Sequence, residues 1–304
     1  MKPNLFIIGA PKCGTSALAH YLSEHPKVFF SNPKEPFYLS TDYPHLKEQH
    51  FLSNDSDYLK LFSHADQRIH SVVGEGSTNY LRSQTAVKNA LEINPQAKFI
   101  VMLRNPISVS HAFHMEQIFA RNEDVVSFEE AWLLQNVRKT GQKIPNACRA
   151  PEFLQYGEIA LFAEQIERFF EVVPEAQRII LLQDDLQKDT LGTYKKTLKF
   201  LDLNYDGRTV FPRVNGSHSH RSEFIANLVL SPPKLLRAPM FFLRGVLRQT
   251  KPTYIEWIKS KLRKKSNRQE LSVSFKEDLL TYFLSDIKRT EALIERDLTD
   301  WKKL

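Results

Sequence analysis

The sequence has few cysteines, no long apolar run and no linker-like tract. Its two cysteines, Cys13 and Cys148, are too few for the disulfide framework of a small secreted domain. Lys2 is the only charged residue before the apolar run at 5–8, which is too short for a signal sequence, and no later run has the length of a membrane span. With no linker or internal repeat to divide it, the chain is expected to form one domain over residues 1–304 and to be cytoplasmic.

The excess of positive charge is confined to one segment. The chain carries 42 Lys and Arg against 35 Asp and Glu, and residues 234–268, from Lys234 to Arg268, contain eleven of the basic residues but only one acidic residue, Glu256. Apolar side chains are interspersed there, as in helices that lie on interfaces. Three interpretations stay open: a solvated face, a surface for an acidic glycan or for peripheral membrane contact, and a nucleic-acid site. No motif of a nucleic-acid-binding domain supports the third, so no nucleic-acid partner is predicted.

Short apolar runs alternate with segments of helical periodicity along most of the chain. Strands are predicted at 5–8, 28–30, 71–75, 98–103 and 178–182. Helices are predicted after the first strand and at 86–93, from Pro106, 159–170, 194–201 and 275–298, with Trp301 as a packing anchor. Strands that alternate with helices pair in parallel through right-handed crossovers. We therefore predict an α/β fold of the P-loop type, a three-layer fold whose central parallel sheet is flanked by helices, with a site at the carboxyl ends of the strands.

A strand, a glycine-containing loop and a helix follow one another near the amino terminus. The loop Gly9-Ala10-Pro11-Lys12-Cys13-Gly14-Thr15-Ser16 ends where a helix begins, so free backbone N–H groups and the positive end of the helix dipole are available to an anion. Lys12, Thr15 and Ser16 add a cation and two hydroxyl groups. The Walker loop of ATP-binding proteins has its lysine directly after the second glycine, where this chain has Thr15. The pattern predicts an anion-binding loop for a ligand other than ATP.

This loop resembles the 5′-phosphosulfate loop of sulfotransferases that use 3′-phosphoadenosine-5′-phosphosulfate (PAPS). The resemblance continues through His25-Pro26 and residues 33–38, is closest to the bacterial and heparan-sulfate-type branch, and extends over nearly the whole chain. It implies that PAPS is the co-substrate and that no metal is needed, because a lysine can neutralise the leaving phosphate. The residues that it assigns to PAPS are Pro11, Lys12, Cys13, Gly14, Thr15 and Ser16, with Lys12 catalytic at the leaving oxygen. Cys13 is interpreted as a space-filling residue rather than a redox group.

The acceptor needs a base for the proton that it loses on transfer. Glu75 stands in Gly74-Glu75-Gly76-Ser77-Thr78-Asn79-Tyr80, which is similar to the motif whose glutamate is the base in heparan-sulfate-type members, and it is the expected base. Lys34 and Glu35 match the Lys-Glu-Pro step of the family and are expected to orient the acceptor or the loop. His111 and His114 are further candidates to reach the acceptor. The acceptor is expected to be a hydroxyl or amine group of a glycan, a glycolipid or a small metabolite.

Two later segments resemble the parts of the family that hold the 3′-phosphate. Arg104 and Pro106 match its Arg-x-Pro motif, and an arginine offers bidentate geometry to a phosphate. The serine of the family falls on Ala112, so Ser108 or Ser110 is expected to replace it. In the late loop that resembles the segment closing over the nucleotide, Arg221 is the predicted ligand of the 3′-phosphate.

Two other functions are compatible with parts of the pattern. A P-loop nucleotide kinase or NTPase would use residues 179–184 as its Walker B strand, with Asp184 on magnesium, but the displaced lysine argues against it. A non-enzymatic protein that binds polyanions or membranes would depend on residues 234–268.

Overall fold

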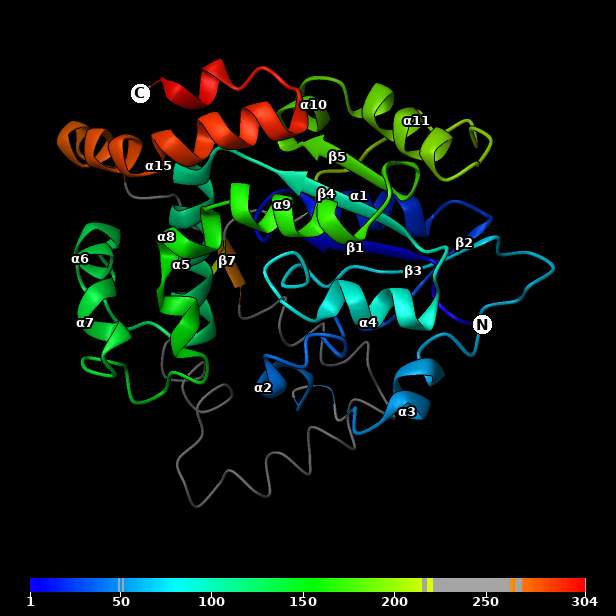
Figure 1. Cartoon of the computed structure of the whole chain (residues 1–304), viewed down its shortest axis with the longest axis horizontal. Helices are drawn as coiled ribbons and strands as arrows, with labels where there is room; N and C mark the ends of the chain where they lie inside the picture. Colours follow the sequence, from blue (N-terminus) through cyan, green and yellow to red (C-terminus); the bar gives the residue numbers. More distant parts are fainter. Residues whose placement is uncertain (49, 51, 215–217, 221–262, 266–269, 304) are drawn as a thin grey trace. The chain divides into compact units, whose positions relative to one another are not determined.

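The central sheet has five strands in the order β2-β3-β1-β4-β5 (Figure 1). The computed structural model describes the chain except residues 49, 51, 215–217, 221–262, 266–269 and 304. Every neighbouring pair of strands in this sheet is parallel, which confirms the expected α/β fold. The strands are β1 (Leu5–Gly9), β2 (Val28–Phe30), β3 (Val72–Glu75), β4 (Lys98–Leu103) and β5 (Arg178–Leu182).

The strand order fixes the faces that the connecting helices cover. The chain crosses from β1 to β2 through α1 (Thr15–Ser23) in one direction, and from β3 to β4 through α4 (Ala86–Ile93) in the other. Because such crossovers are right-handed, α1 covers one face of the sheet. The opposite face is covered by α4 and by α9 (Ala163–Val172), which precedes β5 (Figure 1). The three layers predicted from the sequence are therefore present.

The other described elements surround this sheet. The remaining helices are α2 (Pro44–Glu48), α3 (Asp55–Lys60), α5 (Pro106–Ala120), α6 (Phe128–Leu133), α7 (Gln135–Lys139), α8 (Tyr156–Ala160), α10 (Gln183–Lys188), α11 (Thr190–Phe200) and α15 (Val273–Ile294). Short 3-10 turns are η1 (Pro151–Leu154), η2 (Glu175–Gln177) and η3 (Thr299–Lys302), and β6 (His218–His220) pairs antiparallel with β7 (Arg263–Lys265). None of the helices in the described part of the chain combines the length and the apolar character needed to cross a membrane.

Aromatic side chains fill the space between the sheet and α9. All five residues of β1 are buried, and Phe6 stacks on Phe99 of β4 with 5.5 Å between ring centroids. Phe99 in turn meets Phe169 of α9 edge-on at 5.9 Å. Each fully buried side chain of this kind contributes about 1.5–3 kcal/mol to folding. This packing holds β1 and β4 in register, and with them the loops that leave their carboxyl ends.

Two helix predictions differ from the structure. The periodicity at 159–170 predicts one helix, but α8 ends at Ala160 and α9 begins at Ala163. The carboxylate of Asp286 accepts hydrogen bonds from the N–H groups of Phe162 and Ala163, at 2.8 and 3.0 Å, and so caps a second helix start that periodicity does not reveal. The last helix ends at Ile294 rather than at residue 298. The anchoring residue Trp301 behind it is buried as expected, 3% exposed.

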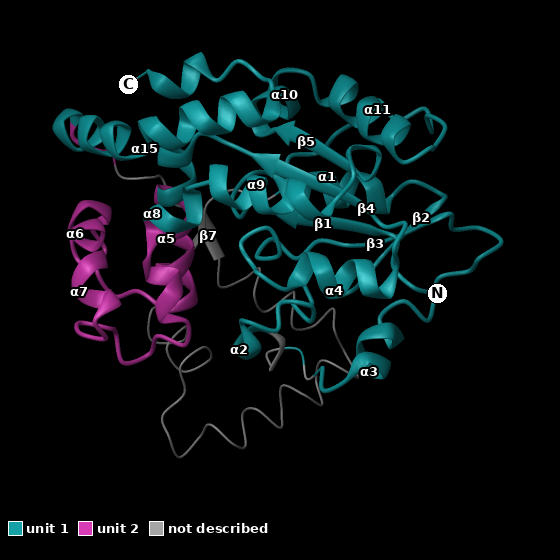
Figure 2. Ribbon diagram, in the orientation of Figure 1, with its two compact units in different colours: residues 1–110, 157–215, 273–304 teal, residues 111–156, 216–272 magenta. Residues whose placement is uncertain are grey.

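The described chain consists of two compact units (Figure 2). Unit 1 comprises residues 1–110, 157–215 and 273–304 and contains the five-stranded sheet. Unit 2 comprises residues 111–156 and 216–272. The core of unit 2 includes a buried bidentate ion pair between Arg138 and Glu123, whose side chains are 1% and 0% exposed. That the chain forms a single domain stays a prediction.

Candidate functional site

Three loops meet at one edge of the sheet because the strands that they follow are neighbours. In the order β3-β1-β4, the carboxyl ends lead into Gly76, into the loop Ala10–Gly14 and into Arg104. A fourth segment joins them after β2, where the Gly76 N–H donates to the backbone oxygen of Lys34 at 2.9 Å. The sequence-predicted residues Lys12, Lys34, Glu75 and Arg104 therefore belong to four segments gathered at the same edge.

The loop after β1 ends in the left-handed backbone conformation expected of an anion-binding loop. Gly14 precedes α1 with φ 90° and makes no side-chain cap, so the first N–H groups of the helix are not satisfied by a capping side chain. The start of the loop is pinned by the Ala10 N–H, which donates to Met102 O of β4 at 2.7 Å. Gly9 packs so closely that a Cβ there would lie 2.9 Å from Leu81 Cβ. Both glycines thus meet a geometric requirement of the loop.

Cys13 is a packing residue of this loop. Its side chain is fully buried, and its thiol donates to Pro11 O at 3.4 Å. Burial raises the pKa of Cys13 to about 12, although the positive charges of Arg104 and Lys12 act in the opposite direction. The thiol is therefore protonated at neutral pH, which agrees with the space-filling interpretation and not with a redox-active thiolate.

Arg104 lies against the loop rather than in open solvent. Its Nη1 donates to Lys12 O at 3.4 Å. Burial lowers the pKa of Arg104, and the neighbouring Cys13 and Asp184 oppose that change. An arginine remains charged after a modest lowering, so this guanidinium adds positive charge beside the amino terminus of α1.

Lys34 and Glu35 lie beside the same loop. Lys34 Nζ is 3.3 Å from Thr15 Oγ1 and 2.7 Å from Glu35 Oε1. The second carboxylate oxygen of Glu35 accepts from Thr78 Oγ1 at 3.2 Å. The two side chains are 23% and 30% exposed, so solvent reaches both of them. A cation and an accessible carboxylate therefore stand together beside the loop that precedes α1.

Glu75, by contrast, is sealed from solvent at the end of β3. Its side chain is 0% exposed and accepts three hydrogen bonds: from Tyr58 and Tyr80 on Oε1, at 2.8 and 2.9 Å, and from Ser77 on Oε2, at 2.5 Å. Burial raises the pKa of Glu75 to about 7, although the three hydroxyl donors favour the ionised form. An acceptor molecule cannot touch this carboxylate without displacing one of these partners.

The hydroxyl groups around Glu75 also hold the segment that carries Lys34 and Glu35. Ser77 Oγ accepts from the Phe37 N–H at 3.0 Å, and Tyr80 OH accepts from the Leu39 N–H at 3.0 Å. Each hydroxyl thus links a backbone group of the segment to the buried carboxylate. Sequence reasoning missed this arrangement: Tyr80 stands in the motif already singled out, but Tyr58 comes from α3 and carries no local signal.

The serine and histidine candidates lie on α5. Ser110 is fully buried and its hydroxyl donates to Pro106 O at 2.9 Å, which argues against a contact of Ser110 with a phosphate. Ser108 lies in the first turn of α5 and is partly exposed. Within unit 2, His111 stacks on Phe128 at 5.0 Å, and His114 Nε2 is 2.9 Å from Val125 O. Burial lowers the pKa of His114, and both rings are at most 7% exposed, as packing residues are.

Two sequence predictions fall outside the described residues or only partly within them. Arg221 is not among the described residues, and of the basic segment 234–268 only residues 263–265 are described, as a backbone strand. Their roles stay predictions.

Asp184, the residue of the rival Walker B interpretation, is engaged elsewhere. It lies in the first turn of α10, and its Oδ2 accepts from the indole Nε1 of Trp301 at 2.9 Å. Across the described ranges, no three His, Cys, Asp or Glu side chains are grouped as metal ligands would be.

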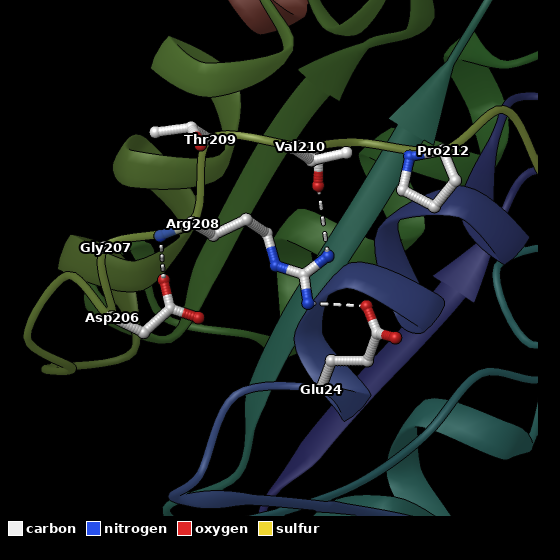
Figure 3. Close-up of a pocket in the computed structure, with 7 residues that line it drawn as sticks. All are labelled: Glu24, Asp206, Gly207, Arg208, Thr209, Val210 and Pro212. Carbon is white, nitrogen blue, oxygen red and sulfur yellow. Dashed lines mark hydrogen bonds and ion pairs between the residues drawn. The ribbon is translucent and has the colours of Figure 1, made fainter.

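An open pocket of about 550 Å³ lies at the opposite end of α1, away from the loop (Figure 3). Arg208 crosses it, with Nη2 on Glu24 Oε2 at 2.5 Å and Nη1 on Val210 O at 3.5 Å. Tyr21 OH donates to Pro212 O at 3.0 Å beside it. These contacts join the segment after α11 to the carboxyl end of α1. None of the predicted site residues lines this pocket.

Comparison with known proteins finds similarity to sulfotransferases. The family model described as "Sulfotransferase family" matches residues 3–207. The chain is 25% identical over 220 residues to bifunctional heparan sulfate N-deacetylase/N-sulfotransferase 3 of Homo sapiens, a match that covers 70% of this chain and 24% of that protein. It is 27% identical over 252 residues to carbohydrate sulfotransferase 15 of Mus musculus, covering 66% of this chain and 44% of that protein. The chain thus spans less than half the length of these curated relatives.

A solved structure has the same fold. The crystal structure of a sulfotransferase from Alicyclobacillus acidocaldarius superposes with a TM-score of 0.71 over 100% of both chains, at 23% sequence identity.

Proposed function

This chain belongs to the sulfotransferase family, and we propose that it transfers a sulfonate group from PAPS to a hydroxyl or amine group of a glycan, a glycolipid or a small metabolite. The observation that carries the proposal is the convergence of positive groups on the amino terminus of α1: Lys34 touches Thr15, and Arg104 touches the backbone of Lys12. A nucleotide with negative charge at its 5′ and 3′ positions fits such an arrangement.

The proposed reaction is an in-line displacement at sulfur. The acceptor oxygen or nitrogen forms a bond to sulfur while the bond from sulfur to the 5′-phosphate oxygen breaks, and that electron pair stays on the phosphate. The acceptor proton passes to a base, and 3′,5′-bisphosphoadenosine leaves. We assign stabilisation of the leaving phosphate to Lys12 and to the backbone N–H groups that precede and begin α1, because negative charge grows there in the transition state.

For the base, the geometry supports Glu35 better than Glu75. The Glu35 carboxylate is 30% exposed and lies next to the lysine that touches Thr15, so an acceptor can approach it. Glu75 is fully buried, and both of its oxygens already accept hydrogen bonds. A general base must come within hydrogen-bond reach of the proton that it takes. We therefore propose Glu35 as the base, in place of the Glu75 that the sequence motif suggests.

Glu75 is then a positioning residue. Through Ser77 it holds the Phe37 N–H, and through Tyr80 it holds the Leu39 N–H, so it fixes the segment that presents Glu35. A buried network in which every hydroxyl is satisfied is rigid, which suits the precision that in-line transfer demands.

The names of the relatives support a glycan acceptor. One is named as a heparan sulfate N-sulfotransferase and another as a carbohydrate sulfotransferase, so a hydroxyl or amine group of a glycan is the acceptor class that we propose to test before the others. The basic segment 234–268 would favour an acidic glycan by charge. A cytoplasmic location is also proposed, on the sequence pattern alone.

A titration without metal tests the proposed donor. Wild-type protein is expected to bind 3′,5′-bisphosphoadenosine with a Kd on the order of micromolar in the presence of EDTA, measured by calorimetry. Transfer of ³⁵S from labelled PAPS to a panel of desulfated glycans is expected to follow. Magnesium-dependent binding of ATP, with no binding of the bisphosphate, would favour the nucleotide kinase instead.

A further inference from the structure

The side chain of Lys34 runs across Gly76 and ends on the anion-binding loop. A Cβ added at Gly76 would lie 2.8 Å from Lys34 Cε, so only glycine leaves room for this path. The backbone is tied at the same place, because the Gly76 N–H donates to Lys34 O at 2.9 Å. The glycine after β3 therefore leaves room for the ammonium group of Lys34 to reach the loop.

The ammonium group lies between two acceptors of different kinds. It donates to Glu35 Oε1 at 2.7 Å and to Thr15 Oγ1 at 3.3 Å. Thr15 is the first residue of α1 and is 4% exposed, so its hydroxyl belongs to the anion-binding loop itself. Glu35 has a second partner, Thr78, on its other oxygen. Lys34 can thus leave Glu35 while Thr78 still orients the carboxylate.

A bound donor would compete with Glu35 for this cation. The phosphosulfate carries more negative charge than one carboxylate, and the loop adds N–H donors and the positive end of α1 to hold it. An ammonium on a flexible stem is suited to such an exchange, since it bonds as a point charge with rotatable donors. Lys34 would need only a small rotation about its terminal bonds, because its ammonium group already lies within hydrogen-bond distance of the loop residue Thr15.

We propose that Lys34 is a second catalytic lysine that exchanges partners: donor binding draws its ammonium from the Glu35 carboxylate onto a sulfonate oxygen of PAPS. This inference rests on the proposed function. The ammonium keeps its proton throughout and neutralises charge on the transferring group. The released Glu35 oxygen accepts the proton of the acceptor as sulfur forms its new bond and the 5′-phosphate oxygen departs with its electron pair. The ion pair therefore keeps the base occupied until a sulfonated donor is present.

Binding of two nucleotides that differ only in the sulfonate tests the exchange. Lys34→Met is expected to weaken binding of PAPS about tenfold to a hundredfold, the value of one charge-assisted hydrogen bond, and to change binding of 3′,5′-bisphosphoadenosine less than about threefold. Lys60→Met is the matched control, since Lys60 also forms an ion pair in unit 1, with Asp57 at 2.9 Å, and it is expected to change neither affinity. Glu35→Gln, which frees Lys34, is expected to bind PAPS at least as tightly as wild type.

Other results of these titrations would contradict either the exchange of partners or the proposed function. Equal weakening of both nucleotides by Lys34→Met, or no weakening of either, would overturn the exchange, because the lysine would then not distinguish the sulfonate. Weaker binding of PAPS by Glu35→Gln would also overturn it. Failure of the wild-type protein to bind either nucleotide would count against the proposed function itself and so is distinguishable from failure of this inference.

Discussion

At the scale of single residues, two glutamates near the same edge of the sheet have opposite environments. Glu35 stands beside a lysine with part of its carboxylate in solvent, whereas Glu75 is enclosed by three hydroxyl groups. Glu75 is the last residue of β3, and Glu35 lies in the segment that follows the neighbouring strand β2. Exposure separates the residue that an acceptor can touch from the residue that holds the segment in place.

The two assignments predict different kinetics for the two amide variants. Glu35→Gln is expected to lower kcat about a hundredfold or more and to keep the affinity for 3′,5′-bisphosphoadenosine, since only the proton acceptor is gone. Glu75→Gln is expected to lower kcat about tenfold at most, since it alters only the contacts that position the segment carrying Glu35. Steady-state rates measure kcat, and calorimetric titration measures the affinity.

The reverse result would restore the assignment suggested by the sequence motif. A loss of kcat of about a hundredfold in Glu75→Gln, with kcat of Glu35→Gln within about tenfold of wild type, would make Glu75 the base. Glu75→Asp keeps the carboxylate on a shorter side chain, and it serves as a control for loss of folding in Glu75→Gln.

At the scale of the element, the β1–loop–α1 unit combines a buried strand with a helix whose first turn has no side-chain cap. Gly14 makes this junction possible with φ 90°, and the loop before it is held by a bond to Met102 O. The helix start is thereby left open to an anion, whereas most helix starts are closed by Ser, Thr, Asp or Asn.

Replacement of Gly14 tests the importance of this junction. Gly14→Ala places a side chain at a positive φ, at a cost of about 1–2 kcal/mol, and its Cβ would lie 3.4 Å from Gln183 Cγ. We expect at least a tenfold loss of affinity for 3′,5′-bisphosphoadenosine, because the loop N–H groups turn away from the ligand. Calorimetric titration measures the affinity, and thermal unfolding measures the stability.

Gly141→Ala is the matched control for backbone strain. Gly141 has φ +81°, and a Cβ there would meet nothing within 4 Å. It should destabilise the protein by a similar amount and leave nucleotide affinity at the wild-type level. Unchanged affinity in Gly14→Ala would show that the loop does not bind the nucleotide.

At the scale of the whole molecule, each compact unit contains a buried glutamate, and the two respond differently to pH. Burial tends to raise the pKa of Glu123 in unit 2, but the hydrogen bonds from Arg138 and Tyr156 prevail and lower it. Stability from Glu123 is therefore lost as the solution becomes acidic. The pKa of Glu75 in unit 1 is raised by burial to about 7, so its effect has the opposite sign.

Glu75 predicts a stability that declines as pH rises. Between pH 4.5 and about 7 the folded protein binds a proton that the unfolded chain has released, so the stability contributed by this group falls by about 3 kcal/mol as the pH rises through this range. Glu75→Gln lacks this ionisable group. Its free energy of unfolding should therefore rise relative to that of wild type by about 3 kcal/mol between pH 5 and pH 8. Urea unfolding at both pH values measures the difference, and parallel pH dependence of the two proteins would contradict it.

Much of the architecture could be predicted from local patterns. The strands at 5–8 and 98–103 are short apolar runs whose residues, Lys98 apart, are buried in a parallel sheet, as is typical of inner strands. The edge strand at 178–182 is buried only at Leu181 and Leu182. Breaks within helical segments could not be predicted in the same way. The break between α8 and α9 depends on Asp286, which is more than a hundred residues away in the chain.

The sequence by itself determined the family, the parallel α/β sheet and the glycine-containing loop before α1, because strand burial, glycine placement and helix starts are set by neighbouring residues. Only the tertiary structure decided which glutamate is accessible. The enclosure of Glu75 comes from Tyr58 of α3 and Tyr80 beyond β3, and the room for the Lys34 side chain comes from Gly76 on another loop. Burial and partner choice are properties of the folded chain as a whole, since they depend on residues that local sequence does not bring together.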